Sequence, residues 1–350
     1  MGTLKPSVVS GRFTWSSFPE NSSMAFDYTE SDMPQTQHQM PQEIGTGWFQ
    51  SIHLPMNMVL RRGVAHFKPE VSGKLLPVAT IEERFHEPVL CVQSTKKGRL
   101  VLLDNELGKD FIFGYHNSLF EHIHLRDSFV RLDASENIEM TTLIIGDSVL
   151  KQLLGEEYAE SLLSGLRVAA IPSTSVNKVP PNISALLHSS ISDHLIGHIA
   201  KLHIQAKVLD YLCALAQYFA GSIKNQQQDS GMEELIYQIH DDLLQLDGKV
   251  PSLNELAARY GMPGRKLKDG FLKIFGKSLF SYITEVRLDE AHDRLLNTGI
   301  PMKIIAKNLG YSHVNHFISA FGKQFGYSPG SLRKKNPGTV PIEQAQSTES

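Results

Sequence analysis

The chain has 350 residues, 41% of them hydrophobic and 20% charged, which is typical of soluble globular proteins and long enough for two domains. No apolar run approaches the roughly 20 residues that span a bilayer, and the N-terminus lacks a signal-peptide pattern. The two cysteines, Cys91 and Cys213, lie far apart, which argues against a disulfide scaffold and a thiolate zinc site. We therefore expect a cytoplasmic protein with no membrane partner.

The formal net charge of −3 hides an uneven distribution. Residues 251–335 hold 14 Lys and Arg against 6 Asp and Glu, a net of +8. The rest of the chain holds 20 against 31, a net of −11. A basic module joined to an acidic one predicts a polyanionic partner, although charge alone fits a solvated basic surface equally well.

Residues 1–44 are rich in Ser, Thr, Gln and Pro and predict a loose arm. Residues 45–220 are expected to form a regulatory domain that is β-rich over 45–135 and helical over 138–220. Short apolar or alternating runs, such as Trp48–Leu54 and Val89–Gln93, recur between Gly, Pro, Asn and Asp residues. They predict a barrel- or sandwich-like domain, and a barrel of this size can hold one small ligand.

The helical part includes a long segment over 198–219 with an apolar stripe. Such a stripe is typical of a core helix, and a dimerisation helix is the alternative. The polar residues 221–231 predict a linker, residues 232–335 a DNA-binding domain, and residues 336–350 a disordered tail. The expected fold class is α+β, with a β-rich N-terminal domain and an all-α C-terminal domain. The apolar stripe of the long segment over 198–219 consists of Leu202, Leu209, Leu212, Leu215, Ala216 and Phe219.

The C-terminal domain contains an internal repeat. Ser252 and Glu255 form a capping-box pattern before a short helix that ends at Gly261, and Pro263 then suits the first position of a second helix. About 49 residues later the pattern returns: a short helix ends at Gly310, and Ser312 is expected to cap a second helix to about residue 325.

The spacing within each unit is typical of a helix-turn-helix. Ala257 and Ala306 provide the small side chain where two helices cross, and Gly261 and Gly310 follow four residues later to turn the backbone. A connecting helix over 279–296 would be about 27 Å long, near one turn of B-DNA. Two recognition helices could therefore enter successive major grooves, and we expect a sequence-specific DNA-binding regulator.

The candidate DNA contacts are exposed polar side chains of the two recognition helices. Arg265 suits guanine and Asn315 suits adenine, because their donors and acceptors match those base edges. Each single position also fits a solvated surface side chain. The candidates are Gly264, Arg265, Lys266, Lys268 and Asp269 in the first unit, His313, Asn315, His316 and Ser319 in the second, and Lys273, Lys303, Lys323 and Arg333 at the phosphates.

Residues 232–333 resemble the AraC/XylS family of bacterial regulators. One departure is Pro263, where a capping Ser is more usual. The sequence of residues 261–288 is most similar to the ferri-siderophore-responsive subgroup. The resemblance implies an activator controlled by a small-molecule effector, here an iron–siderophore complex, with RNA polymerase and a second copy of the chain as partners. It rests on Leu256-Ala257, Gly261-Met262, Leu267, Phe271, Gly276, Arg287-Leu288, Ala291, Leu295-Leu296, Ile305-Ala306, Gly310-Tyr311-Ser312, Phe317, Phe321 and Phe325–Pro329.

Two alternatives concern the N-terminal half. His122 and His124 would lie on one face of a strand, as in metal-binding or enzymatic barrels, although surface or core histidines explain them more simply. The N-terminal half could also serve only for dimerisation. The sequence has no nucleophile motif, no phosphate-binding Gly loop and no HExxH. We therefore expect no enzymatic activity, no catalytic residue, no bound metal and no cofactor.

Overall fold

The computed structural model describes residues 8–15, 23–27, 36–39, 44–191, 197–225, 230–297 and 299–335. The chain divides into two compact units, Met1–Gln226 and Gln227–Ser350. Within the described ranges, no helix is both long and apolar enough to cross a membrane.

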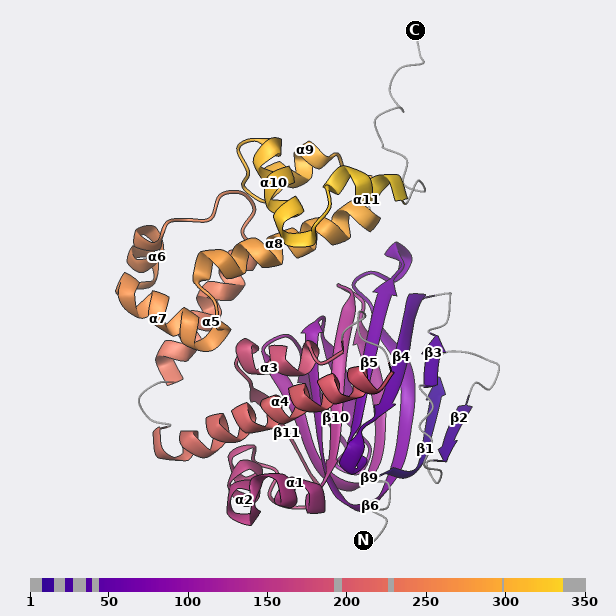
Figure 1. Ribbon diagram of the computed structural model, residues 1–350. Helices are drawn as coiled ribbons and strands as arrows, with labels where there is room; N and C mark the ends of the chain where they lie inside the picture. The colour runs from indigo at the N-terminus through magenta and orange to yellow at the C-terminus, as the bar shows by residue number, and fades with distance from the viewer. Residues whose placement is uncertain are drawn as a thin grey trace. The chain divides into compact units, whose positions relative to one another are not determined.

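The first unit is built on an 11-stranded antiparallel sheet (Figure 1). Outside its main path, β1 (Val8–Trp15) pairs with β6 and with β2 (Ser23–Asp27), and β11 (Ser173–Lys178) pairs with β9. The main path runs through β3 (Thr36–Gln39), β4 (Gly45–His53), β5 (Val59–Phe67), β10 (Ile138–Gly146), β6 (Leu75–Lys97), β9 (Asn117–Asp133), β7 (Leu100–Asp104) and β8 (Lys109–Phe113). Single 3₁₀ turns follow β4 and β5, at Pro55–Asn57 and Pro69–Val71.

The two longest strands, β6 and β9, form an extended antiparallel pair in the sheet. Their register shifts between Arg84 and Val89, and a bulge of this kind bends and twists a strand pair. As a result, the first half of β6 pairs with β1 and the second half with β10.

Four helices cover one face of this sheet: α1 (Asp147–Leu154), α2 (Glu156–Gly165), α3 (Pro181–His188) and α4 (Gly197–Asn225) (Figure 1). Leu90 and Val92 of β6 pack toward the helices, and Val89 and Cys91 belong to a cluster that includes Ile123 and Ile144. Both faces of this stretch are buried, which explains why its sequence is a continuous apolar run rather than an alternating one.

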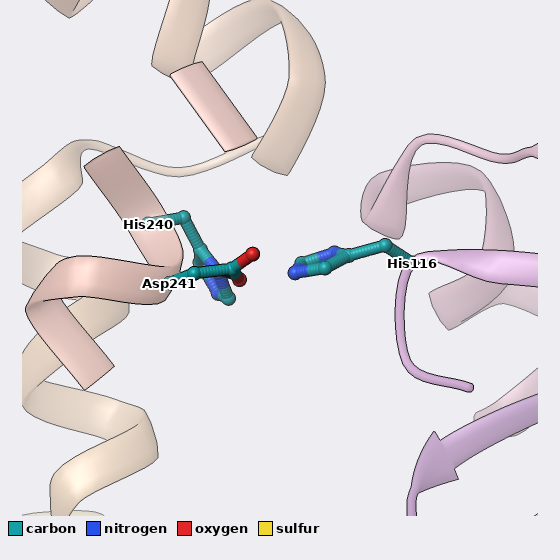
Figure 2. A group of neighbouring side chains, drawn as sticks. All are labelled: His116, His240 and Asp241. Carbon is teal, nitrogen blue, oxygen red and sulfur yellow. Dashed lines mark hydrogen bonds and ion pairs between the residues drawn. The ribbon is translucent and has the colours of Figure 1, made fainter. Parts of the chain in front are cut away.

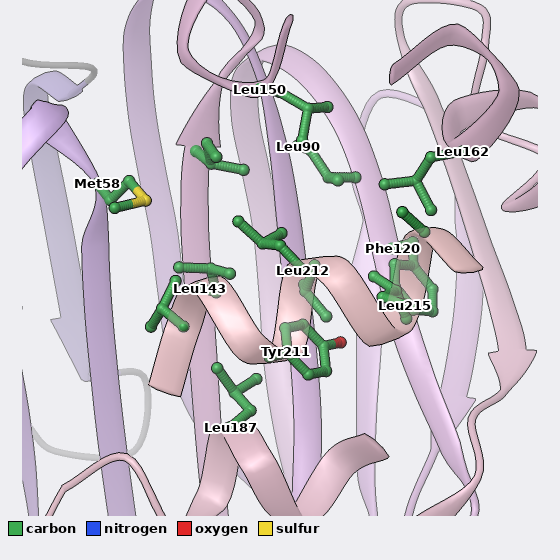
Figure 3. Close-up of a cluster of buried hydrophobic side chains, with 14 of the residues drawn as sticks. Met58, Leu90, Phe120, Leu143, Leu150, Leu162, Leu187, Tyr211, Leu212 and Leu215 are labelled. Carbon is green, nitrogen blue, oxygen red and sulfur yellow. The ribbon is translucent and has the colours of Figure 1, made fainter. Parts of the chain in front are cut away.

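The long helix α4 supplies much of the core (Figure 3). Its Tyr211, Leu212 and Leu215 are fully buried with Phe120 and Leu143 of the sheet. The predicted stripe is therefore only partly core, because Leu202 is 67% exposed on the same helix. With Ile199, which is 68% exposed, it lies on a different face from the buried residues.

Three sequence predictions need correction. The arm expected over 1–44 contains strands β1, β2 and β3 among its described residues, and β1 pairs with the sheet. Residues 138–146, expected in the helical part, form β10 in the middle of the sheet, because the run Thr-Thr-Leu-Ile-Ile favours a strand and both its edges are paired. The expected linker is helical up to Asn225 and again from Ser230, while residues 226–229 and the tail 336–350 lie outside the described residues.

Among its described residues, the second unit contains helices and no strand. α8 (Leu279–Asn297) contacts helices from both halves of the unit. We call α5 (Ser230–Leu244), α6 (Leu253–Tyr260) and α7 (Gly264–Phe275) the first lobe. We call α9 (Met302–Asn308), α10 (Val314–Phe325) and α11 (Pro329–Lys335) the second lobe. Each lobe contains a helix-turn-helix, α6–α7 or α9–α10, so the predicted α+β class with paired units is confirmed.

Candidate nucleic-acid interface

The first helix-turn-helix begins at a reciprocal cap. Ser252 Oγ accepts a hydrogen bond from the Glu255 backbone N–H at 3.4 Å, and the Glu255 carboxylate accepts one from the Ser252 N–H at 2.6 Å. Gly261 ends α6 with φ of +62°, a conformation that costs glycine little. The Met262 N–H then donates to Ala257 O at 3.1 Å, which closes the turn into α7.

The second unit repeats this turn. Gly310 has φ of +84°, and the Tyr311 N–H donates to Ala306 O at 3.0 Å, matching the bond from Met262 to Ala257. Ala306 is buried where α9 meets α10. The internal repeat seen in the sequence therefore produces the same backbone geometry twice.

The starts of both recognition helices differ from the predictions. Pro263 is the N-cap of α7 rather than its first residue, and Gly264 begins the helix. His313 rather than Ser312 is the N-cap of α10, and its side chain makes no capping hydrogen bond. In both cases the preceding turn needs one more extended residue before helical geometry starts.

Aromatic side chains anchor the inner faces of both recognition helices. In the first lobe, Phe271 is fully buried, and the His240 ring stacks on Phe275 with centroids 4.7 Å apart. His240 lies on α5 beside Asp241, and its Nδ1 is 2.9 Å from that carboxylate (Figure 2). In the second lobe, Phe317 and Phe321 are fully buried.

The first recognition helix turns its charged side chains outward. Arg265 is 94% exposed and its Nε lies 3.7 Å from the Asp269 carboxylate one turn later, a contact too long and too exposed to hold it. Lys266 and Lys268 are exposed as expected. Gly264 is half-buried rather than exposed as expected, because it lies beside Leu253 where α6 and α7 cross; a Cβ there would make an ordinary contact, 3.4 Å from Leu253 Cγ.

The second recognition helix presents His313, Asn315, His316 and Ser319, all exposed. The two histidine rings lie edge to face with centroids 5.6 Å apart. Both helices therefore offer hydrogen-bonding side chains in their first two turns, which is where helix-turn-helix proteins contact base edges.

The phosphate candidates lie around these helices. Lys303 and Lys323 are exposed, and Lys273 lies 3.8 Å from Glu233 across the first lobe. The backbone of Arg333 belongs to α11, and its side chain lies outside the described residues.

Sequence reasoning gave Arg287 no role, and the structure makes it central to this unit. The residue is 5% exposed, and its guanidinium donates to backbone carbonyls of both lobes, including Leu246 O and Leu309 O. These acceptors are 41 and 22 residues away, so no local pattern could have identified them.

Comparisons with known proteins agree with this geometry. A family model described as a helix-turn-helix domain matches residues 256–335. The regulatory protein PchR of Pseudomonas aeruginosa is 29% identical over 251 residues, covering 67% of this chain and 81% of PchR. The transcriptional activator RhaS of Yersinia pestis is 29% identical over 109 residues, covering 31% of this chain and 40% of RhaS. The chain is a DNA-binding transcriptional regulator, and it is similar to regulators of the AraC/XylS type.

Among solved structures, an apo form of a ToxT variant from Vibrio cholerae is 12% identical, with a TM-score of 0.33, and covers 81% of this chain and all of that one. The chain spans most of PchR but less than half of RhaS.

The first unit of this regulator contains a mainly apolar cavity of about 100 Å³ between the strands. Trp48, Phe49, Ile81 and Met140 line it, and Arg62 lies over the Trp48 ring at 5.4 Å. The cavity is thus bounded by β4, β5, β6 and β10 within the β-rich part, and by β9 through Val130 and Leu132.

A buried ion network borders this cavity. Arg126 donates to Glu83 at 2.8 Å and to Glu121 at 2.6 Å, and Arg61 pairs with Glu83. Burial alone would raise the pKa of Glu83, but the charges of Arg61 and Arg126 hold that pKa below its ordinary value. Two cations and two carboxylates leave this network without net charge.

The histidine pair proposed as a metal-binding alternative is separated by the fold. His122 is buried, with Nδ1 3.0 Å from Val168 O and Nε2 2.9 Å from the Asp147 carboxylate, whereas His124 is exposed. Both ring nitrogens of His122 already face hydrogen-bond acceptors, so a metal would have to displace one of them.

Proposed function

We propose that α7 and α10 read two successive major grooves of one operator. The supporting observation is the repeated turn, which presents Arg265, Lys266 and Lys268 from one lobe and Asn315 and His316 from the other. α8 spans 19 residues, about 29 Å at 1.5 Å per residue, close to the 34–36 Å of a DNA turn. The net charge of +8 over 251–335 favours the approach to the phosphates.

The test is to sequence the duplexes that the full-length protein retains from a random library, and then to measure affinity by fluorescence anisotropy at several salt concentrations. We expect a bipartite motif and a salt-dependent affinity. Lys109→Ala is the control. It lies in β8 of the first unit, far in sequence from both recognition helices, and should leave the affinity for DNA unchanged. Retention of no duplex above background would overturn the proposal.

We further propose that a small-molecule effector binds at the cavity of the first unit and changes the DNA affinity of the second. An iron–siderophore complex is the first candidate, from the resemblance noted in the sequence. Typical ligand sites measure roughly 300–1,000 Å³, so a ligand of that size would occupy the cavity mouth as well as the cavity of about 100 Å³. Because the adjoining ion network is neutral, the part that enters should be apolar and uncharged.

Trp48 offers a direct readout of this binding. The chain has two tryptophans, so a Trp15→Phe variant leaves Trp48, at the cavity wall, as the single indole. We expect saturable quenching of Trp48 by ferric siderophores, which Val130→Phe in the cavity should abolish and Ile112→Phe on the exposed side of β8 should not. Saturable binding that Val130→Phe leaves intact would place the effector elsewhere.

The third part of the proposal is a homodimer formed by the outer face of α4. Ile199, Leu202, Ala206, Leu209 and Cys213 follow one another at intervals of three and four residues, a heptad pattern. The first heptad combines Ile199 in its first position with Leu202 in its fourth, which favours two parallel strands, and the later first positions hold the small residues Ala206 and Cys213. This face extends over about 21 Å, which is short for a stable dimer, so DNA with paired sites should strengthen the association. Contact with RNA polymerase, as expected for an activator, stays a prediction.

A further inference from the structure

The two lobes of the second unit are joined by more than α8. The loop after α5 runs back against the end of α9, where the Gly248 N–H donates to Asn308 O at 2.7 Å. Residues of the first lobe therefore hydrogen-bond to residues of the second, about 60 positions apart in sequence. If α8 were the single connection, bending of this helix would let the two lobes rotate relative to one another. The second connection, through Gly248 and Asn308, restricts that rotation.

Arg287 occupies the centre of this connection. From α8, Nη1 donates to Gly248 O at 2.6 Å and to Leu309 O at 3.2 Å. Nη2 donates to Leu246 O at 2.5 Å and to Leu243 O at 3.3 Å. The four acceptors belong to the C-terminal ends of α5 and α9 and the loop after α5, so one side chain binds carbonyls at the end of a helix from each lobe.

The electrostatics suit this position. Burial lowers the pKa of Arg287, while Glu290 and Asp247 oppose that shift, and a guanidinium remains charged at neutral pH. Carbonyls at helix C-termini carry partial negative charge and otherwise lack intrahelical donors. A planar cation with five N–H groups can satisfy several of them at once, which a lysine ammonium cannot.

Glycines permit the backbones to meet. A Cβ on Gly310 would lie 2.4 Å from Gly248 O and 2.8 Å from Lys249 Cα, so any side chain there would push the loop away. Gly261 is the equivalent residue of the first lobe, and a Cβ there would meet nothing within 4 Å. Both glycines have positive φ, so substitution strains both turns, but only at Gly310 does it also disturb the contact between lobes.

We propose that Arg287 and the Gly248–Gly310 contact form a brace that fixes the separation of α7 and α10, and thereby selects operators by the spacing of their half-sites. Arg287 is a positioning residue that binds no DNA. This inference rests on the proposed reading of two grooves, because one extra base pair moves a half-site by about 3.4 Å and a tenth of a turn. A braced domain cannot follow that movement.

The first test needs no DNA. Spin labels at Asn254 on α6 and Gln324 on α10, both exposed, report the distance between lobes in full-length protein carrying Cys213→Ser. Pulsed electron resonance should give a narrow distance distribution that broadens in Arg287→Lys and in Gly310→Ala. Gly261→Ala is the matched control and should keep the narrow distribution.

The second test uses duplexes selected by the full-length protein, with the spacer unchanged, shortened or lengthened by one base pair, and with one half-site scrambled. Joining two binding modules raises affinity by roughly 10²–10⁴, so Arg287→Lys and Gly310→Ala should lower the advantage of the full site over the single half-site by about tenfold. The affinities of both variants for duplexes with the three spacer lengths should also differ less than those of the parent. Their affinity for a single half-site should stay near that of the parent.

Two results distinguish a failure of the brace from a failure of the proposed DNA-binding function. If the parent protein binds no duplex, the proposed function fails. If the parent binds but the variants keep its distance distribution and spacer preference, the brace is wrong. Circular dichroism and thermal unfolding identify a variant that has lost its fold. If either Arg287→Lys or Gly310→Ala has done so, the other variant decides whether the brace exists.

Discussion

The guanidinium of Arg126 lies 2.6 Å from the carboxylate of Glu121, and both side chains are nearly inaccessible to water. The same guanidinium binds Glu83, which also pairs with Arg61, so two cations balance two buried carboxylates inside the sheet of the first unit. A buried charge without its partner is strongly unfavourable, so this network should control whether the strands stay paired.

Arg126→Met should therefore destabilise the first unit by about 3–5 kcal/mol, because it leaves a buried carboxylate uncompensated. Urea unfolding followed by Trp48 fluorescence measures this loss, and the helical signal of the second unit serves as an internal control. Adding Glu121→Gln should restore part of the stability. A change below about 1 kcal/mol would mean that water or another cation replaces Arg126.

His188 predicts a pH dependence of the same unit. Burial lowers its pKa from 6.5 to about 4, and its ring nitrogens lie 3.2 Å from the hydroxyls of Ser94 and Thr141. The unfolded chain binds a proton near pH 6.5 that the folded chain does not, so stability should fall as the pH drops from about 6.5 to 4, by on the order of 2–3 kcal/mol. His188→Gln cannot titrate, and its stability should change less across this window; equal slopes would contradict the assignment.

Arg265→Ala tests the first recognition helix. Loss of a bidentate contact with guanine should weaken binding by about 1–3 kcal/mol and relax the preference at one base position. Asn315→Ala is the corresponding change in the second lobe and should relax a different position. Uniform weakening across all sequences would instead make Arg265 a phosphate contact.

Cys213 tests the dimer formed by α4. In a parallel pair it would face its counterpart, so mild oxidation should produce a covalent dimer, enhanced by DNA with paired sites. Cys213→Ser should abolish the dimer. Cys91→Ser should not, because Cys91 is buried and burial raises its pKa to about 12. Leu202→Asp should lower the crosslinked fraction, and crosslinking that Leu202→Asp leaves unchanged would exclude this face.

Local signals in the sequence predicted local structure well. Ser252 and Glu255 form the predicted capping box, and Gly261 adopts the predicted left-handed conformation, because both depend on residues within one turn. The short apolar run at 138–146 was misassigned because a strand and a buried helix segment share that pattern over so few residues. Arg287 escaped prediction because its partners are carbonyls, which every residue possesses and no sequence pattern distinguishes.

The two recognition helices differ in the kind of chemistry they expose. α7 presents fixed positive charge from Arg265, Lys266 and Lys268, whereas the first turns of α10 present the imidazoles and amide of His313, Asn315 and His316. Added salt competes with cation–phosphate contacts more strongly than with hydrogen bonds to base edges. Beside the guanine contact expected of Arg265, α7 offers two lysines that suit phosphates, so we expect added salt to weaken its contribution to DNA binding more than that of α10.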